Sequence, residues 1–215
     1  MTRRQVINPE NPDIRIIGEV AALIKTGHIV VLPTDTAYGL TGDPSNAEVV
    51  HRILAVKERE KKLGMPLLAA NLQQVRDLVI LSPLAEAVAT QVWPGAVTLV
   101  VSARQRFPQG ILGPENSLAV RIPNHPVPLK VIQTTGFPII GTSANKSNTT
   151  SPRTADAAAT QLTNLVDYIL DGGPTQYSAD STIVNLTRDP PEIIREGAVS
   201  RVEINRILKI GAESQ

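Results

Sequence analysis

One stretch of the sequence, residues 28–42, constrains the fold of this chain more than any other. Ile29 to Leu32 is an uninterrupted apolar run with β-branched residues, which is typical of a short strand buried on both faces, and Pro33 ends it. Polar side chains follow at once, namely Thr34, Asp35, Thr36 and Tyr38. Because ligands bind beyond the carboxyl ends of strands in open α/β sheets, this stretch predicts a strand that delivers polar groups to a binding site.

A second stretch has the same build. Residues 138–142 are again short and mostly apolar, and Thr142, Ser143 and Asn145 stand at their end. A single polar turn after a strand is ordinary. Two such strand ends, from distant parts of one chain, predict a shared pocket.

Helical and strand patterns alternate along the chain. One helix is expected from a cap at Asn11-Pro12 to Gly27, a second is expected to begin at a capping box over 45–48, and a third is expected to begin at residue 82. Further helices are expected over 71–79, 126–135, 155–162 and 203–210. Strands are expected over 67–70, 97–101, 118–122, 166–170, 181–186 and 192–195. This order predicts an α/β fold in which helices pack on a twisted mixed sheet. With 215 residues and no internal repeat, the chain is expected to form one domain over 1–215.

Composition excludes several classes of protein. The chain has 0 cysteines, so disulfides and thiolate metal sites are ruled out, and its three histidines are not spaced as zinc ligands. Its N-terminus lacks the apolar segment of a signal peptide, and its longest charge-free run is interrupted by Pro94 and Gly95, so we expect a soluble cytoplasmic protein that does not enter membranes. A net charge of +1 and 3% aromatic residues argue against a broad nucleic-acid surface.

The common nucleotide and nucleophile motifs are missing. There is no Gly-Lys pair for a P-loop, no G-x-G-x-x-G run and no nucleophile elbow, so an enzyme built on this chain is expected to work without covalent catalysis. Cations together with hydroxyls and an amide suit a site that orients a polyphosphate beside a small zwitterion. The candidates are Lys57, Arg59, Arg121, Arg195, Thr34, Thr36, Ser143, Ser151, Ser181 and Asn145.

Two of these cations have an alternative interpretation. Lys57 continues the apolar stripe of the helix after residue 45, so it either points into a cavity or reaches water, and the mixed charges of 57–62 favour water. Arg121 lies on the opposite strand face from Leu118 and Val120. An arginine there is paired with an acidic residue or bound to a ligand, and the sequence leaves both open.

Taken together, seven segments resemble the YrdC/Sua5 family of threonylcarbamoyl-adenylate synthases. They are PTDTAYGL at 33–40, KER at 57–59, WPG at 93–95, AVRIPNHP at 119–126, GTSANKS at 141–147, STIVN at 181–185 and IIREGAVS at 193–200. The combination of K-x-R with a distant S-x-N is the family's signature. The match covers nearly the whole chain, so the resemblance implies the single-domain YrdC-like fold.

The resemblance also implies an activity. The family converts L-threonine, bicarbonate and ATP into threonylcarbamoyl-AMP and pyrophosphate, for the modification of adenosine 37 in ANN-decoding tRNAs. It implies that Thr34, Arg121, Gly141 and Ser181 bind threonine. It implies that Lys57, Arg59, Lys61, Ser117, Ser143, Asn145, Ser151 and Arg195 bind ATP, with Lys57, Arg59, Ser143 and Asn145 as the catalytic set. Mg²⁺ is expected to arrive with ATP and not to bind protein side chains, and tRNA and the tRNA threonylcarbamoyl transferase complex are the further partners implied.

One departure from the family concerns the loop after the K-x-R. Glu60 stands where the family has proline, and Pro66-Leu67 follows about two residues late, so a longer loop is expected. The sequence leaves two other functions open: an RNA-binding module, which the balanced charge disfavours, and a carbamoyl-adenylate enzyme with another acceptor, whose relatives carry additional domains.

Overall fold

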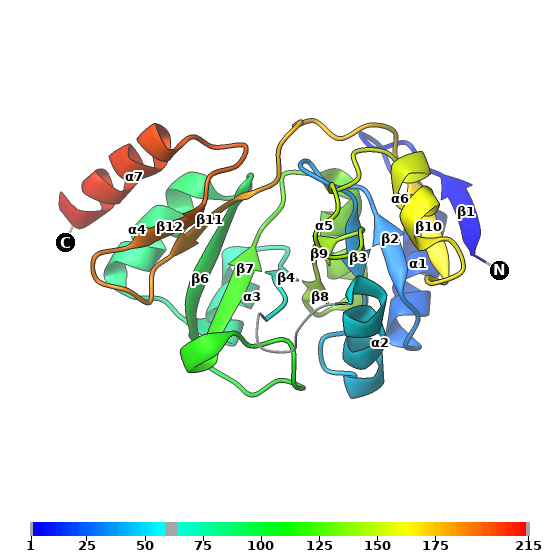
Figure 1. The fold of residues 1–215 in the computed structure, drawn as a ribbon, viewed down its shortest axis with the longest axis horizontal. Coiled ribbons are helices and arrows are strands. Elements are labelled where there is room, and N and C mark those ends of the chain that lie inside the picture. The colour runs from blue at the N-terminus through cyan, green and yellow to red at the C-terminus, as the bar shows by residue number, and fades with distance from the viewer. Residues whose placement is uncertain (1, 59–63, 214–215) are drawn as a thin grey trace.

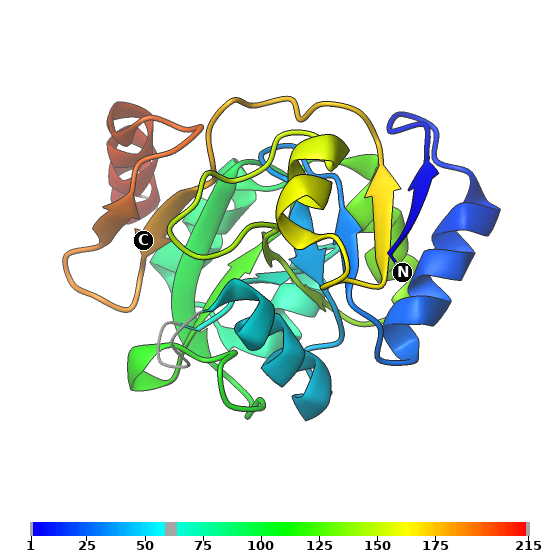
Figure 2. The same ribbon diagram turned by 45° about the vertical axis from the view of Figure 1, so that its right-hand side comes forward.

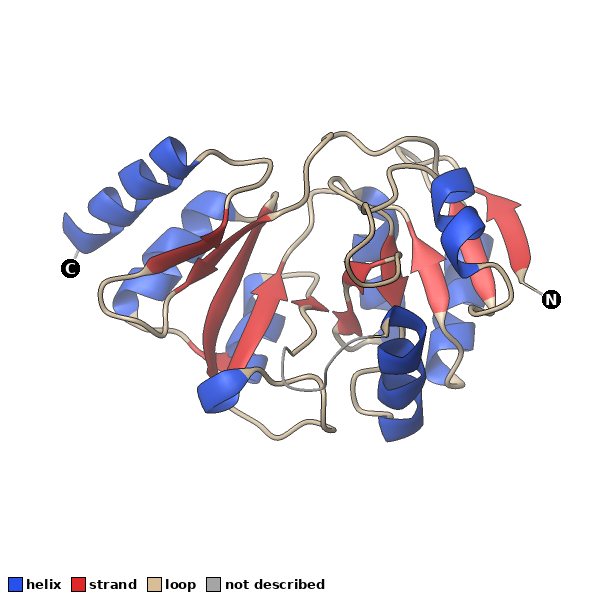
Figure 3. Cartoon of the chain, in the orientation of Figure 1, coloured by secondary structure: helices blue, strands red, loops and turns tan. Residues whose placement is uncertain are grey.

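The computed structural model describes residues 2–58 and 64–213, and these residues form two β-sheets with helices packed against them (Figures 1 and 3). The expected mixed α/β class is confirmed. The strands are shared between two mixed sheets rather than one, a five-stranded and a seven-stranded sheet within the described residues. The N- and C-termini lie at opposite ends of the molecule (Figure 1).

The first sheet contains the strand that the opening motif predicts. Its order is β1 (Arg3–Val6), β10 (Tyr168–Asp171), β2 (Val30–Leu32), β3 (Gly39–Thr41) and β9 (Thr142–Ser143). β2 is parallel to β10 and antiparallel to β3. Helices α1 (Ile14–Lys25) and α5 (Pro126–Thr135) bury Ile17, Val20 and Val131 in a core shared with Val30 and Leu32, so β2 is covered and its polar end is held in place.

The second sheet lies on the other side of the molecule (Figure 2). Its order is β12 (Glu192–Arg195), β11 (Thr182–Asn185), β6 (Val97–Ala103), β7 (Ser117–Arg121), β4 (Leu67–Leu68) and β8 (Ile139–Ile140), and β5 (Val79–Ile80) pairs with β6. The remaining helices are α2 (Ala47–Lys57), α3 (Leu72–Leu78), α4 (Pro83–Val92), the 3-10 turn η2 (Pro114–Asn116), α6 (Ala155–Leu162) and α7 (Arg201–Glu213). Val97, Leu99 and Val101 of β6 point into the core, as their alternation predicts.

The chain passes between the two sheets at two places that matter for the site. Gly141 separates β8, in the second sheet, from β9, in the first, and its N–H donates to the carbonyl of Pro66 at 2.8 Å. The single strand expected over 138–142 is therefore two short strands. The segment between β10 and β11 crosses from the first sheet to the second along the top of Figure 1.

Local signals place most element ends correctly. α5 ends at Gly136 in the left-handed conformation, as predicted, and α6 has the predicted bounds. The cap predicted at Asn11 is wrong: α1 begins after Asp13, whose carboxylate accepts from the N–H of Arg15 at 2.8 Å. The helix after residue 45 is capped by Asn46 alone.

Three strands are missing from the sequence predictions. β1 is a polar edge strand of four residues, and β3 and β5 have three and two residues, too few to show an alternation. Val79, expected at the end of a helix, begins β5. β1 forms by pairing with β10 in parallel, a partner more than 160 residues away in the chain. Among the helices of the described residues, none is long and apolar enough to cross a membrane.

Candidate functional site

A cavity of about 400 Å³ lies between the two sheets, and both predicted polar strand ends open into it. The first sheet contributes the loop after β2 and strand β9, and the second contributes the ends of β7, β11 and β12. Seven of the residues predicted from the sequence line it: Thr34, Thr36, Arg121, Gly141, Ser143, Ser181 and Arg195. The prediction that distant strand ends share one pocket is confirmed.

The loop after β2 is shaped by the hydroxyl of Thr34. Its Oγ1 donates to the carbonyl of Ala37 at 2.6 Å and lies 3.2 Å from the backbone nitrogens of Thr36 and Ala37, which donate to it. A hydroxyl that closes its own turn in this way fixes the loop without help from a ligand. Thr34 is only 5% exposed, so it offers a preformed wall of the cavity.

Arg121, which the sequence leaves either paired with an acidic residue or bound to a ligand, forms an ion pair and also lines the cavity. Its Nη2 lies 2.6 Å from Oδ1 of Asp35, its Nη1 donates to Oγ1 of Thr36 at 2.7 Å, and its Nε donates to the carbonyl of Gly95 at 2.7 Å. Burial lowers the pKa of Arg121, and the charge of Asp35 opposes that shift. An arginine side chain has five N–H donors, so these three bonds leave donors for a ligand and hold the guanidinium plane in one orientation.

Lys57 is buried at the end of α2, and the solvated interpretation is wrong. Its side chain is 3% exposed, and its Nζ donates to the carbonyl oxygens of Ser143 at 2.6 Å and Asn145 at 2.9 Å. The Nζ also lies 3.2 Å from Asn145 Oδ1 and 3.5 Å from Ser143 Oγ. The lysine therefore joins α2 to β9 and the residues that follow it, so Lys57, Ser143 and Asn145 lie together, as the resemblance implies. Arg59 and Lys61 lie outside the described residues.

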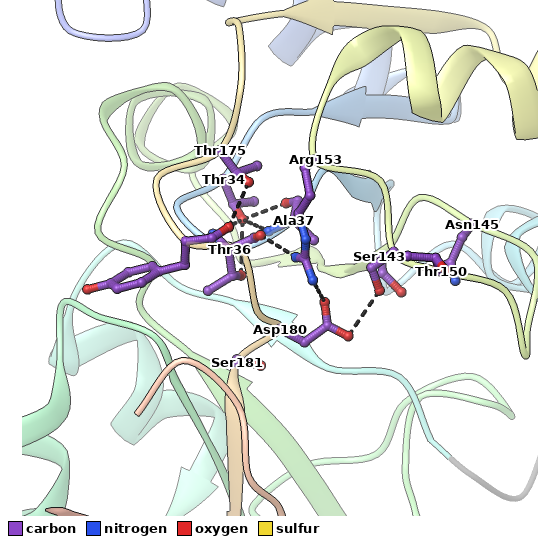
Figure 4. Close-up of polar contacts among 12 residues, drawn as sticks. Thr34, Thr36, Ala37, Ser143, Asn145, Thr150, Arg153, Thr175, Asp180 and Ser181 are labelled. Atoms are coloured by element: carbon purple, nitrogen blue, oxygen red, sulfur yellow. Dashed lines mark hydrogen bonds and ion pairs between the residues drawn. The ribbon is translucent and has the colours of Figure 1, made fainter. Parts of the chain in front are cut away.

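Asp180 is an acidic residue of the site that the sequence analysis missed. It lines the cavity just before β11, and its Oδ2 accepts from Ser151 Oγ at 3.0 Å and from Arg195 Nη1 at 3.4 Å. The guanidinium of Arg195 also donates to the carbonyl of Ser181 at 2.8 Å, and Ser181 Oγ lies 2.9 Å from Thr98 Oγ1. In the sequence, the one indication that Asp180 belongs to the site is its position next to Ser181. Figure 4 shows Asp180 among the polar contacts of this region.

Some predicted residues lie away from the cavity wall. Ser117 Oγ donates to the carbonyl of Pro114 at 2.7 Å and closes the turn before β7. Asn145 donates through Nδ2 to the carbonyl of Thr149 at 2.6 Å, so its amide holds the loop after β9. Ser151 is buried and reaches the cavity through Asp180.

The cavity wall has both polar and apolar parts. Hydroxyls and the guanidinium groups of Arg121 and Arg195 stand on one part, and Leu68, Val100 and Ile183 line another. Asp180 is the only carboxylate among the described residues that line it. Tyr38 also lines the cavity, but its hydroxyl donates to the carbonyl of Gly173 at 2.6 Å, and burial raises its pKa to about 12. Such a cavity fits an anionic ligand that also carries a small apolar group.

We expect Gly141→Ala to lower both stability and ligand binding. A Cβ at this position would overlap Leu68 Cγ and lie 2.8 and 2.9 Å from its two methyl groups, so Leu68 would have to move. Overpacking of this kind costs about 1–3 kcal/mol. Urea unfolding measures the cost. The matched control is Gly136→Ala, where a Cβ meets nothing within 4 Å but φ is +83°, so that variant should lose stability without any change in the cavity. Wild-type ligand affinity in Gly141→Ala would contradict the prediction.

The fold and cavity define an α/β protein with a cavity between two mixed sheets that is lined by arginines and hydroxyls. The Sua5/YciO/YrdC family model, described as telomere recombination, matches residues 22–197. The chain belongs to this family, which confirms the resemblance seen in the sequence.

Individual relatives support the same conclusion. The threonylcarbamoyl-AMP synthase of Bacillus subtilis is 32% identical over 195 residues, which make up 89% of this chain and 56% of that protein. The chain therefore spans little more than half of that relative. The putative threonylcarbamoyl-AMP synthase of Mycobacterium tuberculosis is 34% identical over 208 residues, 96% of this chain and 95% of that protein.

Two solved structures have the same fold. The structure of Pyrococcus abyssi Sua5 complexed with L-threonine has a TM-score of 0.89 at 33% identity, and the match covers 94% of this chain and 60% of that one. Escherichia coli YciO has a TM-score of 0.87 over 95% of this chain and 99% of its own, and at 23% identity it supports the fold alone. The expected YrdC-like fold is confirmed.

Proposed function

We propose that this protein is a threonylcarbamoyl-AMP synthase, which forms L-threonylcarbamoyladenylate and pyrophosphate from L-threonine, bicarbonate and ATP. The observation that carries the proposal is the cavity between the sheets, where arginines and hydroxyls from separate segments of the chain converge. Relatives named as threonylcarbamoyl-AMP synthases, and a related structure with L-threonine bound, support it.

The reaction needs two anions to be held together. The amine of threonine adds to the carbon of bicarbonate and water leaves, which gives a carbamate. A carbamate oxygen then bonds to the α-phosphorus of ATP while the bond to the pyrophosphate oxygen breaks. Because both partners are negatively charged, positioning and positive charge are the main contributions a protein can make.

The proposed roles follow from the placement of the cations. Arg121 would pair with the carboxylate of threonine through its remaining donors, beside the wall formed by Thr34. Arg195 would contact the nucleotide, and Ser143 on the cavity wall would lie near the reacting groups. Ser151 and Lys57 lie behind the wall and would act through Asp180 and Ser143, to which they are bonded. The apolar part of the wall suits the methyl group of threonine or the adenosine.

We propose that Mg²⁺ enters as the ATP complex. No cluster of three or more His, Cys, Asp or Glu side chains suited to a metal is present among the described residues. Asp180, the carboxylate on the described wall, faces Arg153 and Arg195, whose charges disfavour a cation there. These side chains fit an ion held mainly by phosphate oxygens and water, which would neutralise charge on the triphosphate.

The test is an assay of pyrophosphate release by the purified protein. We expect release that depends on threonine, bicarbonate and ATP together. Valine, which has the shape of threonine without the hydroxyl, should react at least about 100-fold more slowly if the site bonds that hydroxyl. Absence of threonine-dependent release, from protein with an intact thermal transition, would reject the proposed function.

The product would be a reactive mixed anhydride, so we propose tRNA and the tRNA threonylcarbamoyl transferase complex as the partners that consume it. Because the net charge is only +1, direct binding of tRNA is expected to be weak. Filter binding at low and at physiological salt measures this. Tight binding with a steep salt dependence would instead favour the RNA-binding module.

A further inference from the structure

Arg153 connects the two walls of the cavity, although no motif of the sequence analysis contains it. Its Nη1 donates to the backbone carbonyl of Thr36, in the loop after β2, and its Nη2 lies 2.8 Å from Asp180 Oδ1. Arg153 itself belongs to the segment between β9 and α6. Figure 4 shows its side chain between Thr36 and Asp180. We call these two contacts the Arg153–Asp180 bridge.

The bridge joins groups that belong to different sheets. Thr36 follows β2 of the first sheet, and Asp180 precedes β11 of the second. Asp180 also accepts from Ser151, two residues before Arg153, and from Arg195 of β12. On the first side, the Tyr38 N–H donates to the carbonyl of Pro152 and the Tyr177 N–H to that of Asp35, both at 2.9 Å. The bridge therefore lies within a continuous set of bonds across the cavity.

We propose that Arg153 and Asp180 are positioning residues, which set the place of the threonine-binding loop after β2, with Thr34 and Arg121 bonded in it, relative to the nucleotide-binding Arg195. This inference rests on the proposed function. Arg153 touches neither the expected threonine groups nor the expected ATP groups directly, and it acts through Thr36 and Asp180.

The proposal predicts a particular kinetic defect. Without Arg153, Thr34 keeps its internal hydrogen bonds and Arg121 keeps Asp35, so threonine retains its contacts. Arg195 likewise keeps its bonds to Ser181. What is lost is the correct position of the two bound substrates relative to each other. A misplacement of about 1 Å at a reacting centre lowers the rate up to about 100-fold. The defect should therefore appear in kcat rather than in KM.

A matched ion pair elsewhere in the chain provides the control. Arg52 and Asp167 lie 3.2 Å apart with side-chain exposures of 40% and 30%, against 27% and 28% for Arg153 and Asp180. They line a different cavity, at the far end of β10 and β2. A pair that only stabilises the fold should behave like this control.

The experiment is a double-mutant cycle on the full chain with threonine-dependent pyrophosphate release as the readout. We expect Arg153→Ala to lower kcat at least tenfold while both KM values stay within about threefold. Asp180→Ala should lower kcat at least as much, because it also removes the acceptor of Ser151 and Arg195. The double variant should be no worse than Asp180→Ala, because Arg153 acts through Asp180. Arg52→Ala, Asp167→Ala and their double variant should keep kcat within twofold. A kcat for Arg153→Ala within twofold of the wild type, or losses that multiply in the double variant, would overturn the proposal.

Hydrogen exchange separates this proposal from the proposed function. In Arg153→Ala, the amides of Tyr38 and Tyr177 should exchange at least tenfold faster, whereas Arg52→Ala should leave them unchanged. If the wild type releases no pyrophosphate, the proposed function fails, and the exchange rates still decide on the bridge. Unchanged exchange at both tyrosines would show that Arg153 does not hold the two walls.

Discussion

Arg121→Ala is expected to lower the free energy of unfolding by about 3–5 kcal/mol and to remove the response to threonine. The Asp35 side chain is fully buried, and its Oδ2 has no hydrogen-bond partner among the described residues, so loss of Arg121 leaves an uncompensated charge in the interior. Breaking a buried pair from one side has a cost of this size. Urea unfolding measures the stability, and titration with threonine measures binding.

A double variant separates the two effects of Arg121. Asp35→Leu with Arg121→Met replaces the pair by apolar groups of similar volume, which is often neutral for stability. This protein should recover most of the lost stability and still fail to respond to threonine. Wild-type stability of Arg121→Ala would show that the pair is not buried in solution. A wild-type response to threonine in either variant would remove Arg121 from the amino-acid side of the cavity.

Lys57→Met is expected to lower threonine-dependent pyrophosphate release at least about 100-fold, the usual effect of removing a donor that stabilises developing charge. It should also cost about 1–3 kcal/mol of stability, because the carbonyl oxygens of Ser143 and Asn145 lose a charged donor. Methionine keeps the aliphatic part of the side chain and removes the ammonium. Activity is measured at a temperature where circular dichroism shows the variant to be folded.

The control lies in the same helix. Ile53 is fully buried in α2, one turn before Lys57, and Ile53→Ala should cost about 2–5 kcal/mol as a core truncation. Its specific activity should stay within about twofold when the protein is folded. If the two variants lost activity in proportion to their lost stability, Lys57 would be a structural residue of the loop and not part of the site.

The sequence predicted those parts of the fold that local patterns encode. α5 and α6 have the predicted bounds because their apolar spacing, caps and, in α5, the stop at Gly136 act within a few residues. β1 and β3 were missed because each is short and is held by its partner strand rather than by its own pattern. The prediction of a common pocket succeeded because both polar segments directly follow buried strands, whose ends a sheet brings together.

Some residues of the candidate site could be predicted from the sequence and others could not. Thr34, Ser143 and Ser181 were expected from their places at strand ends, and they line the cavity. Asp35, Arg153 and Asp180 were missed as partners, since an acidic or basic residue in a loop looks the same in a sequence whether it faces water or another charge. Lys57 shows the reverse case, where a run of mixed charges predicted a solvated side chain and the fold buried its first residue.

From the sequence alone came the α/β class, the family resemblance and the residue types that gather around an anionic ligand, because each of these depends on patterns read over short distances along the chain. Tertiary structure decided the division into two sheets, the pairing of Arg121 with Asp35, and the contact of Lys57 with the segment after β9. These features join residues more than 80 positions apart, and their energies depend on burial and on distances that exist only once the chain has folded.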